Sequence, residues 1–288
     1  MRILPVVLLA ACSSATPHGH TVALRPACAA NTYWNGKTCA SAGDAPKQLD
    51  SGAQAIASQD VDAIKAAVDA AEKAGPLDYA SNIRLWEERG IGLAYGDDDP
   101  GAKTAFDMML ALDPGHVLSY RLSPKATLVF EEVRKAPQPA PSVDVNWQRG
   151  QKVGDPLPID IEVVSDRKKF LDHATLFVRE HGDAWHAADL TLTKDKTIVL
   201  PAIHADKPVS LELYLRAYDA HDNEVFSWAD AQHPRELPLR YEPPTPWYRK
   251  WWVWAIAGTV AVAGTGIAVY ELTIAPPDKI DGSATVAR

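Results

Sequence analysis

Three aspartates precede a glycine and a lysine in the segment GDDDPGAKT, residues 96–104. The spacing is close to the phosphate-binding form GxxxxGK[ST], but Ala102 separates Gly101 from Lys103 and breaks the motif. Three adjacent carboxylates would also repel the phosphates that such a loop must bind. The alternating ligands and distal Glu of a calcium loop are missing. We therefore interpret this segment as a solvated turn that leads into a helix cap.

The segment HGDAWH contains His181, Asp183 and His186. His181 and Asp183 would share a strand face, but the intervening Gly-Asp pair favours a turn, so we interpret these histidines as surface residues of a hairpin tip. His18 and His20 lie where no element would hold a fixed coordination geometry. The sequence shows no serine in a nucleophile elbow. We predict no metal site, no cofactor and no enzymatic activity, unless residues scattered along the chain converge.

Two of the three cysteines, Cys28 and Cys39, flank the segment AANTYWNGKT. Its Asn35-Gly36 pair is a preferred centre of a two-residue hairpin turn, where both positions need positive φ. Such a hairpin folds the cysteines toward each other, and we predict a Cys28–Cys39 disulfide in an oxidising compartment. A metal site is not expected here, because the spacing is wide and no neighbouring pair completes four ligands.

The composition is that of a globular protein of two or three modules. The chain has 288 residues, of which 47% are hydrophobic and 23% charged, with a formal net charge of −8. Binding to a phosphate backbone needs clustered Lys and Arg, and no such cluster occurs between the two hydrophobic ends of the chain. We therefore expect no nucleic-acid partner.

The N-terminus has one positive residue, an apolar run from Ile3 to Ala11, and then Cys12. The run is too short to span a bilayer comfortably and fits a secretory signal. The four residues that end at Cys12, LAAC, resemble the bacterial lipobox. That resemblance implies a lipoprotein signal peptide at 1–11 and lipidation of Cys12. Residues 13–27 are rich in Ser, Ala, Thr, Pro and His, which predicts a mobile tether, so that 12–45 comprises a tether with the small disulfide hairpin. An ordinary cleaved signal with an incidental cysteine is the alternative.

Helical periodicity extends over residues 46–136 as four apolar stripes. They comprise Val61, Ile64, Val68 and Ala71; Ile83, Trp86, Gly90 and Leu93; Ala102, Ala105, Phe106, Met109 and Leu110; and Ala126, Val129, Phe130 and Val133. Asp99 and Ser123, each followed by a proline, are typical helix starts. Gly96 and Gly115 lie where helices should end.

Five of these helical positions resemble the tetratricopeptide repeat in type and spacing, whereas three weaker positions depart from its pattern. The five are Trp86, Gly90, Ala102, Phe106 and Pro114. Gly90 and Ala102 would let two helices approach closely, and Pro114 would stop the second one. Windows shifted by one repeat length do not match. The resemblance therefore implies one repeat packed by atypical helices, with a generic helical bundle as the alternative.

After the Pro-rich linker KAPQPAPS, residues 135–142, the period changes from helical to alternating. About seven short β-branched or aromatic runs predict an antiparallel β-sandwich over 142–241. Within it, LELYLRAYDAHDNEVFSW resembles the last two strands of fibronectin type III and related immunoglobulin-like modules, with a hairpin at 221–223. No cysteines connect the two expected sheets.

The sandwich region is rich in aromatic residues: Trp147, Trp185, Trp228, Tyr214 and Tyr218. Exposed aromatics are stacking platforms in carbohydrate-binding modules. Most of these residues alternate with polar ones, as core-facing positions should, so we favour a structural role for them.

No charged residue occurs from Trp251 to Tyr270. Length and terminal aromatics predict a transmembrane helix at 251–272, followed by a polar tail at 273–288; a buried core helix is the alternative. Small residues recur along this segment, at Ala255, Thr259, Ala263 and Gly264. They either form a self-association face or merely contribute hydrophobicity, and the sequence leaves both open.

The sequence thus predicts a multidomain α + β chain: a tetratricopeptide-like helical bundle, an antiparallel β-sandwich and one transmembrane helix. The function that we expect is a non-enzymatic envelope scaffold, held at the lipid bilayer with its main domains in the periplasm, inner membrane favoured. The helices and the sandwich would bind a protein partner, with self-association through the membrane helix left open. The alternative is a peptidoglycan- or glycan-binding module that uses the sandwich aromatics. The alternative expects exposed aromatics on one face of 142–241, whereas the scaffold expects an apolar groove within 46–136.

Overall fold

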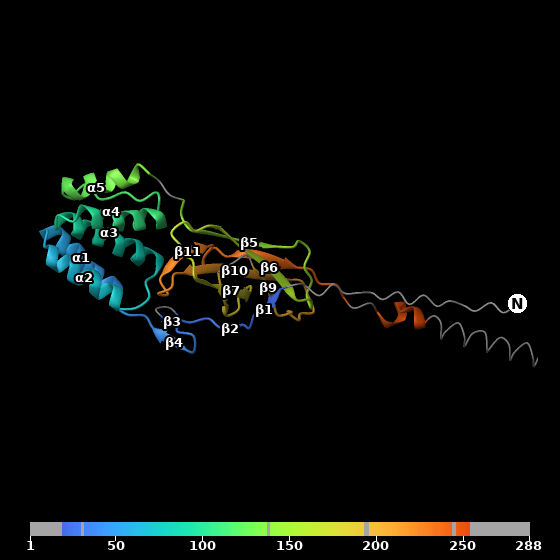
Figure 1. The fold of residues 1–288 in the computed structure, drawn as a ribbon. Helices are drawn as coiled ribbons and strands as arrows, with labels where there is room; N and C mark the ends of the chain where they lie inside the picture. The colour runs from blue at the N-terminus through green and yellow to red at the C-terminus, as the bar shows by residue number, and fades with distance from the viewer. Residues whose placement is uncertain (1–18, 30–31, 137–138, 193–195, 244–245, 254–288) are drawn as a thin grey trace, which may run out of the picture. The chain divides into compact units, whose positions relative to one another are not determined.

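The computed structural model describes residues 19–29, 32–136, 139–192, 196–243 and 246–253. The chain clusters into two units, residues 1–241 and 242–288. The described part of the second unit contains the short 3-10 helix η1 (Trp247–Arg249) and exposes Trp251 and Trp252. The helices and strands that follow belong to the first unit (Figure 1).

Five α-helices occur among the described residues. They are α1 (Ala45–Ser58), α2 (Val61–Lys73), α3 (Tyr79–Tyr95), α4 (Asp99–Leu112) and α5 (Pro124–Arg134). The cap of α4 is Asp98, not the predicted Asp99, because the Asp98 carboxylate accepts the backbone N–H of Gly101 at 3.0 Å. Gly96 is the C-cap of α3, as predicted, whereas the C-cap of α4 is Asp113, two residues before Gly115.

Helices α3 and α4 pack closely where α3 has a glycine. A Cβ at Gly90 would lie only 2.5 Å from Cε1 of Phe106. Phe106 is fully buried and meets Phe130 of α5 edge to face, with 5.5 Å between ring centroids. Ala102 is also fully buried in this helical core. The small residue at position 90 therefore leaves room for the ring that fills the centre of the helical layer.

Two sheets enclose a second apolar core. The four-stranded sheet has the order β1 (His20–Thr21), β9 (Lys196–Leu200), β6 (Leu157–Ser165), β5 (Ser142–Trp147). The other has the order β11 (Glu224–Trp228), β10 (Val209–Tyr218), β7 (His173–Glu180), β8 (His186–Thr191), β2 (Arg25–Pro26), and β12 (Arg235–Leu239) also pairs with β10. Ile159 and Ile198 of the first sheet share one buried cluster with Leu176 and Leu213 of the second.

The segment before the disulfide hairpin is part of both sheets, although the sequence suggested a mobile tether there. Strand β1 pairs in parallel with β9, and β2 pairs antiparallel with β8. Val22, between them, is 7% exposed and belongs to the core of the sheets. Residues 19–29 thus extend the sheets before the chain reaches the hairpin of β3 (Thr32–Trp34) and β4 (Cys39–Ser41).

Buried hydrogen bonds join the helices to the sheets. Nδ2 of Asn82 in α3 donates to the carbonyl of Glu224 at 3.1 Å. The backbone N–H of Glu224 donates to the Leu77 carbonyl at 2.9 Å, and the Leu77 N–H donates to Oδ1 of Asn223 at 3.0 Å. Since these buried or partly buried groups satisfy one another, the helical layer and the hairpin between β10 and β11 have a fixed contact.

The predicted fold class is wrong in its membrane component. Among the residues that the structure describes, no helix is both long and apolar enough to cross a membrane. The longest of them, α3, has 17 residues and carries four charged side chains, whereas a span needs about 20 mostly apolar residues. From residue 254 onward, the span predicted at 251–272 lies outside the described residues, as does the tail at 273–288.

Candidate functional site

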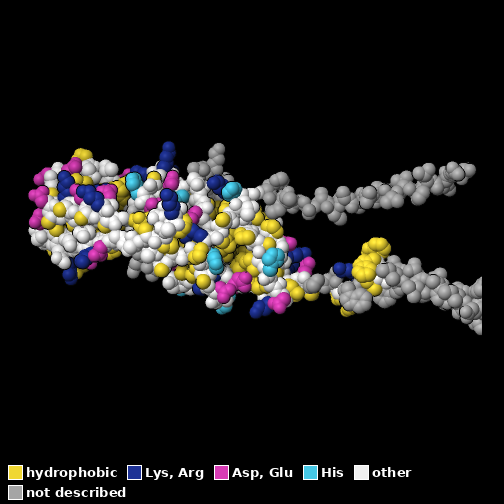
Figure 2. Space-filling model, turned by 90° about the horizontal axis from the view of Figure 1, so that it is seen from below, with side chains coloured by type: hydrophobic (Ala, Val, Ile, Leu, Met, Phe, Trp, Pro, Cys, Tyr) yellow, Lys and Arg dark blue, Asp and Glu magenta, His cyan; other side chains and the backbone are white. Residues whose placement is uncertain are grey.

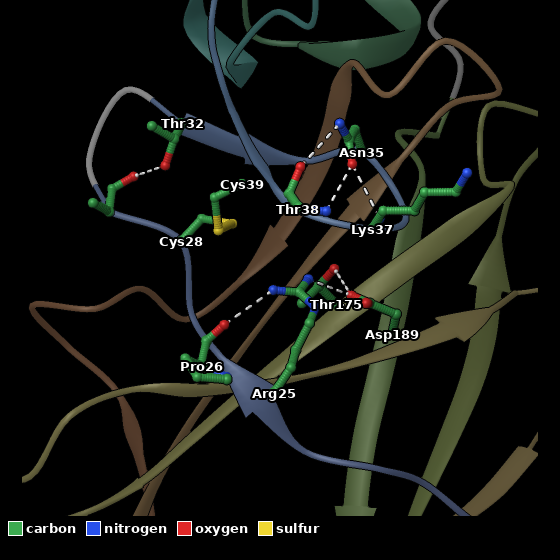
Figure 3. Close-up of a disulfide and its surroundings, with 11 residues drawn as sticks. Arg25, Pro26, Cys28, Thr32, Asn35, Lys37, Thr38, Cys39, Thr175 and Asp189 are labelled. Carbon is green, nitrogen blue, oxygen red and sulfur yellow. Dashed lines mark hydrogen bonds and ion pairs between the residues drawn. A yellow bond between two sulfur atoms is a disulfide. The ribbon is translucent and has the colours of Figure 1, made fainter.

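The disulfide predicted between Cys28 and Cys39 is confirmed, and it closes the β3–β4 hairpin (Figure 3). Eleven positions separate the two cysteines in the sequence. Cys39 is exposed, whereas Cys28 lines the space between the hairpin and the larger sheet. The bond therefore holds the hairpin as a small, fixed projection beside that sheet.

The hairpin turn is shifted by one residue from the predicted Asn35-Gly36 centre. The Asn35 N–H donates to the Thr38 carbonyl at 3.2 Å, so Gly36 and Lys37 are the two central residues. Gly36 has a φ of 88°, which glycine adopts without steric cost. Oδ1 of Asn35 accepts the backbone N–H groups of Lys37 and Thr38 at 3.0 and 2.9 Å. The asparagine thus stabilises the turn through its side chain and not through a left-handed backbone.

Strands β7 and β10 direct one row of side chains to the core and the other toward the hairpin. The register of the two strands sets Tyr214 opposite Phe177 and Tyr218 opposite His173. The rings of Phe177 and Tyr214 stack at 4.4 Å, and those of His173 and Tyr218 at 5.2 Å. Figure 2 shows hydrophobic and histidine side chains gathered over the strands, while the helical end carries many charged ones.

Arg25 connects the sheet to the hairpin. Its guanidinium donates to both carboxylate oxygens of Asp189, each at 2.7 Å, and Asp189 also accepts the Thr175 hydroxyl at 2.9 Å. The same guanidinium lies over the Trp34 ring, 4.3 Å from its centroid. Figure 3 shows Arg25 directed from β2 toward Asp189 and Thr175. This arrangement fixes Trp34 against the sheet.

The space between the hairpin and the sheet is a cleft of about 700 Å³, here called the hairpin cleft. Tyr33 and Trp34 line it from the hairpin, and His173, Tyr214 and Tyr218 line it from the sheet. Its size lies within the range of roughly 300–1,000 Å³ that is usual for ligand pockets. Aromatic and charged side chains therefore share one concave surface.

His173 lies between two aspartates at one side of the hairpin cleft. Nδ1 is 3.1 Å from a carboxylate oxygen of Asp172, and Nε2 is 3.2 Å from one of Asp222. Burial raises the pKa of the adjacent Tyr218 phenol, and the Glu224 carboxylate raises it further. Tyr218 therefore stays a neutral phenol, and the free carboxylate charge of this side comes from Asp172 and Asp222.

A second cleft of about 650 Å³ begins where the hairpin cleft ends, and we call it the junction cleft. Trp86 and Met108 line it from the helices, and Phe170 lines it from the loop before β7. Tyr33, Ala220 and Asp222 line both clefts. The two clefts therefore adjoin, and together they form what we call the trough.

A separate groove of about 270 Å³ lies between α2 and α3. Its apolar side chains are Val61, Ile64, Val68 and Leu93, with Lys65 and Arg89 among its charged ones. A Cβ at Gly92 would lie 2.6 Å from Cγ2 of Ile64, so the two helices approach closely beneath it. The groove lies within 46–136, where the scaffold interpretation expected an exposed apolar groove, but its Ile64 and Val68 side chains are buried.

The structure separates the site residues predicted from the sequence. Trp86 lines the junction cleft under the guanidinium of Arg89, at 4.8 Å, while Pro114 follows the end of α4. Cys12 and the predicted membrane-helix positions lie outside the described residues; those positions are Ala255, Thr259, Ala263 and Gly264. Among the predicted disulfide and repeat positions that the structure describes, Trp86 and Cys28 line the trough, and the others do not.

The HGDAWH histidines are not brought together around a metal. His181 contacts Glu212, whose pKa is lowered chiefly by the hydrogen bond from Arg179, while Asp183 and His186 are exposed. In the part of the chain that the structure describes, no group of three or more His, Cys, Asp or Glu side chains is placed to hold a metal ion.

The five aromatics considered for the sandwich divide between its two faces. Trp147 and Trp228 pack against the core, edge to face at 6.1 Å. Trp185, Tyr214 and Tyr218 instead lie on the outer face, where Trp185 meets Tyr214 at 4.7 Å. The sequence interpretation assigned most of the five to the core and missed Tyr33 and Trp34 as cleft residues. Their position directly before the predicted turn was the available signal.

No family model and no curated protein matches the chain. The assignments to a tetratricopeptide repeat and to a lipoprotein are therefore unsupported, and the membrane-helix assignment is corrected by the described helices. The close approach at Gly90 stands as an observation about helix packing alone.

Proposed function

We propose that this chain is a non-enzymatic scaffold that binds another protein, and that the trough receives an extended segment of that partner. The observation that carries the proposal is the continuity of the two clefts through Tyr33, Ala220 and Asp222. A site that runs from a sheet face to a helical layer suits a chain-like ligand better than a compact small molecule. The disulfide supports an oxidising compartment, for which we propose the bacterial cell envelope.

The packing of the aromatic side chains favours a peptide over a glycan. Sugar stacking needs open ring faces, but Arg25 covers a face of Trp34 and Arg179 covers a face of Trp185, at 4.3 and 4.2 Å. Tyr214 is only 6% exposed between Phe177 and Trp185. The rings therefore mainly form the apolar sides of the cleft and do not offer open faces for stacking. A peptide needs such walls together with polar groups for its main chain.

A glycan ligand remains the second candidate because of one specific observation. Tyr33, Trp34 and Tyr218 are half-buried, not fully buried, where they line the hairpin cleft beside Asp172 and Asp222. Half-exposed rings next to carboxylates are also suited to a sugar chain. The experiment must therefore be able to detect either ligand.

The test is site-specific photo-crosslinking of the full chain in its native cells. A photoreactive residue replaces Ala220, which is exposed and lines both clefts. Matched positions are Lys65 in the α2–α3 groove and the exposed Asp155, which lines none of the clefts described above. The proposal expects stoichiometric capture of one protein from position 220 and none from position 155.

Other outcomes would redirect the proposal. Capture from position 65 alone would place the partner on the helices and refute the trough as the docking surface. Capture of no protein, together with retention of the chain on purified peptidoglycan or polysaccharide, would establish the glycan alternative. Equal capture from all three positions would mean non-specific contact and would also refute the proposal.

A further inference from the structure

The charges that line the hairpin cleft are unevenly compensated. Of its two arginines, Arg25 is held by Asp189, and Arg216 lies 3.5 Å from a carboxylate oxygen of Glu224. Both positive groups are therefore already paired within the protein. Asp172 and Asp222 remain, with side chains that are 55% and 50% exposed.

One imidazole cannot neutralise these two carboxylates. Among the described side chains, Asp172 and Asp222 both contact His173, at 3.1 and 3.2 Å. A neutral imidazole has a single N–H, and a protonated one carries a single positive charge. In either state at least one negative charge is left at the rim of the cleft. The surplus is local, and it has the same sign as the net charge of −8.

Aromatic rings line the same part of the cleft. Tyr218 stacks on His173, and Tyr33 lines the cleft from the hairpin. A flat cation beside carboxylates and rings combines ion pairing with cation–π contact. The chain already uses this combination: the Arg25 guanidinium binds Asp189 in bidentate form and covers Trp34, and Arg179 pairs with Glu212 and covers Trp185.

We propose that the hairpin cleft receives a basic side chain of the partner peptide, arginine in preference to lysine, at the exposed carboxylates of Asp172 and Asp222 that flank His173. This inference rests on the proposed function, because it names the residue type that the trough selects. Asp222 also lines the junction cleft, so the peptide main chain continues from this point toward Trp86. Arginine is preferred because its planar fork matches a carboxylate and stacks on a ring, whereas lysine offers a point charge.

The test uses short synthetic peptides and the full chain. The probes are acetyl-Gly-Ser-Arg-Ser-Gly-amide and the same peptide with citrulline, lysine or glutamate at its centre. Citrulline keeps the shape of arginine without its charge. Binding is followed by NMR shifts of the backbone amides of residues 172–173 and 220–222. We expect arginine to bind more tightly than lysine, and citrulline and glutamate to bind weakest.

Two isosteric variants, Asp172→Asn and Asp222→Asn, locate the contact. Asn tolerates the positive φ of 64° at position 222, so the loop conformation is retained. Partly exposed ion pairs are worth up to about 1 kcal/mol, so each variant should weaken arginine binding about three- to fivefold. The citrulline peptide should be unaffected, Asp155→Asn serves as the matched control, and added salt should reduce the preference for arginine.

The outcomes separate this inference from the function on which it rests. Equal binding of arginine and citrulline, or no binding of either, overturns the basic-residue inference. Arginine binding that neither aspartate variant weakens overturns it as well. If crosslinking from position 220 still captures a protein in these cases, the scaffold proposal survives. If chitin oligosaccharides bind at 172–173 and 220–222 while peptides do not, both proposals fail.

Discussion

The buried carboxyl of Glu88 offers the most quantitative test of the helical layer. Glu88 of α3 is 3% exposed and its Oε1 accepts Nε of Arg84 at 2.8 Å, while its buried Oε2 has no hydrogen-bond partner among the described residues. A Cβ at Gly52 of α1 would lie 2.0 Å from that oxygen, so the glycine makes the space that the carboxyl occupies.

Burial raises the pKa of the Glu88 carboxyl from 4.5 to about 7, although the neighbouring Arg84 opposes the change. The folded chain therefore holds this proton more tightly than the unfolded chain does. The stabilising contribution is complete below about pH 4.5 and is lost as the pH rises toward 7. At about 1.4 kcal/mol per pH unit, the ionised carboxylate costs the fold about 3 kcal/mol at high pH.

Replacing the group by its neutral isostere, Glu88→Gln, should remove this pH dependence. We expect the stability difference between variant and wild type to shift in favour of the variant by about 2–3 kcal/mol between about pH 5 and pH 8. The assay is urea unfolding followed by far-UV circular dichroism at both pH values, with slopes compared to confirm a common unfolding reaction.

The other titratable groups contribute equally to wild type and variant. The change with pH in the stability difference between the two proteins therefore reports on position 88 alone. The control is Glu72→Gln. Glu72 lies on α2, its side chain is 59% exposed, and it pairs with Arg89 of α3. The control should follow the wild-type pH profile. If Glu88→Gln also follows it, the carboxyl is ionised at little cost in the fold, and the argument from its burial is wrong.

Three further predictions concern packing and cross-links. Gly90→Ala should destabilise the chain by about 1–3 kcal/mol in urea unfolding, because the new Cβ would lie 2.5 Å from the Phe106 ring. Asn82→Ala should cost about 1–3 kcal/mol in the same assay, and should speed hydrogen exchange at the helix–sheet contact, because it leaves a buried carbonyl without its donor. Replacing Cys28 and Cys39 by serine should lower the free energy of unfolding by about 2–3 kcal/mol, and dithiothreitol should then have no further effect on thermal melting.

A specific result would contradict each of these three predictions. Gly115→Ala is the control for the glycine, because the nearest atom to its new Cβ is 3.5 Å away, in ordinary contact. Equal effects at positions 90 and 115 would refute the close approach of α3 and α4. Unchanged hydrogen exchange in Asn82→Ala would show that the helices and sheets do not depend on this bond. A wild-type chain insensitive to dithiothreitol would mean that the disulfide does not stabilise the fold.

Local chemistry explains what could be predicted from the sequence. The disulfide followed from two cysteines around a turn-forming pair, and Asp98 lies one residue from the predicted cap of α4. In both cases the interacting groups are close in sequence, so a few residues suffice. The error of one residue in the turn has the same origin. Asn35 was expected to adopt positive φ, but it stabilises the turn through its side-chain oxygen instead.

The N-terminal strands could not be predicted in this way. β1 and β2 have two residues each, which is too short for an alternating pattern to be recognised. Their pairing depends on edges of sheets that are formed more than a hundred residues later, at β9 and β8. The sequence therefore assigned Arg25 to the tether, although its hydrogen bonds to Asp189 hold it in the hairpin cleft.

The outer-face aromatics were misassigned for a different reason. Alternation in β10 separates two faces, and the row containing Leu211, Leu213 and Leu215 is the buried one. Tyr214 belongs to the other row, yet it is only 6% exposed because Phe177 and Trp185 cover it. Burial and orientation toward the main core are thus separate properties. An aromatic side chain on the outer face is covered when the neighbouring strands supply rings and arginines at the matching register.

This separation bears directly on how the trough is built. The walls of its hairpin cleft come chiefly from residues 25–29, 32–36, 172–177 and 214–222, which lie far apart in the sequence and meet only in the folded chain. The rings and paired arginines of the outer face make a rigid floor, whereas Asp172 and Asp222 remain at its rim, half exposed. If the trough binds a peptide as proposed, an electrically compensated floor with an uncompensated rim would select that peptide by the charge of one side chain and not by hydrophobic area. For that reason the loss of a rim carboxylate, more than the loss of any ring, should change which partner the chain prefers.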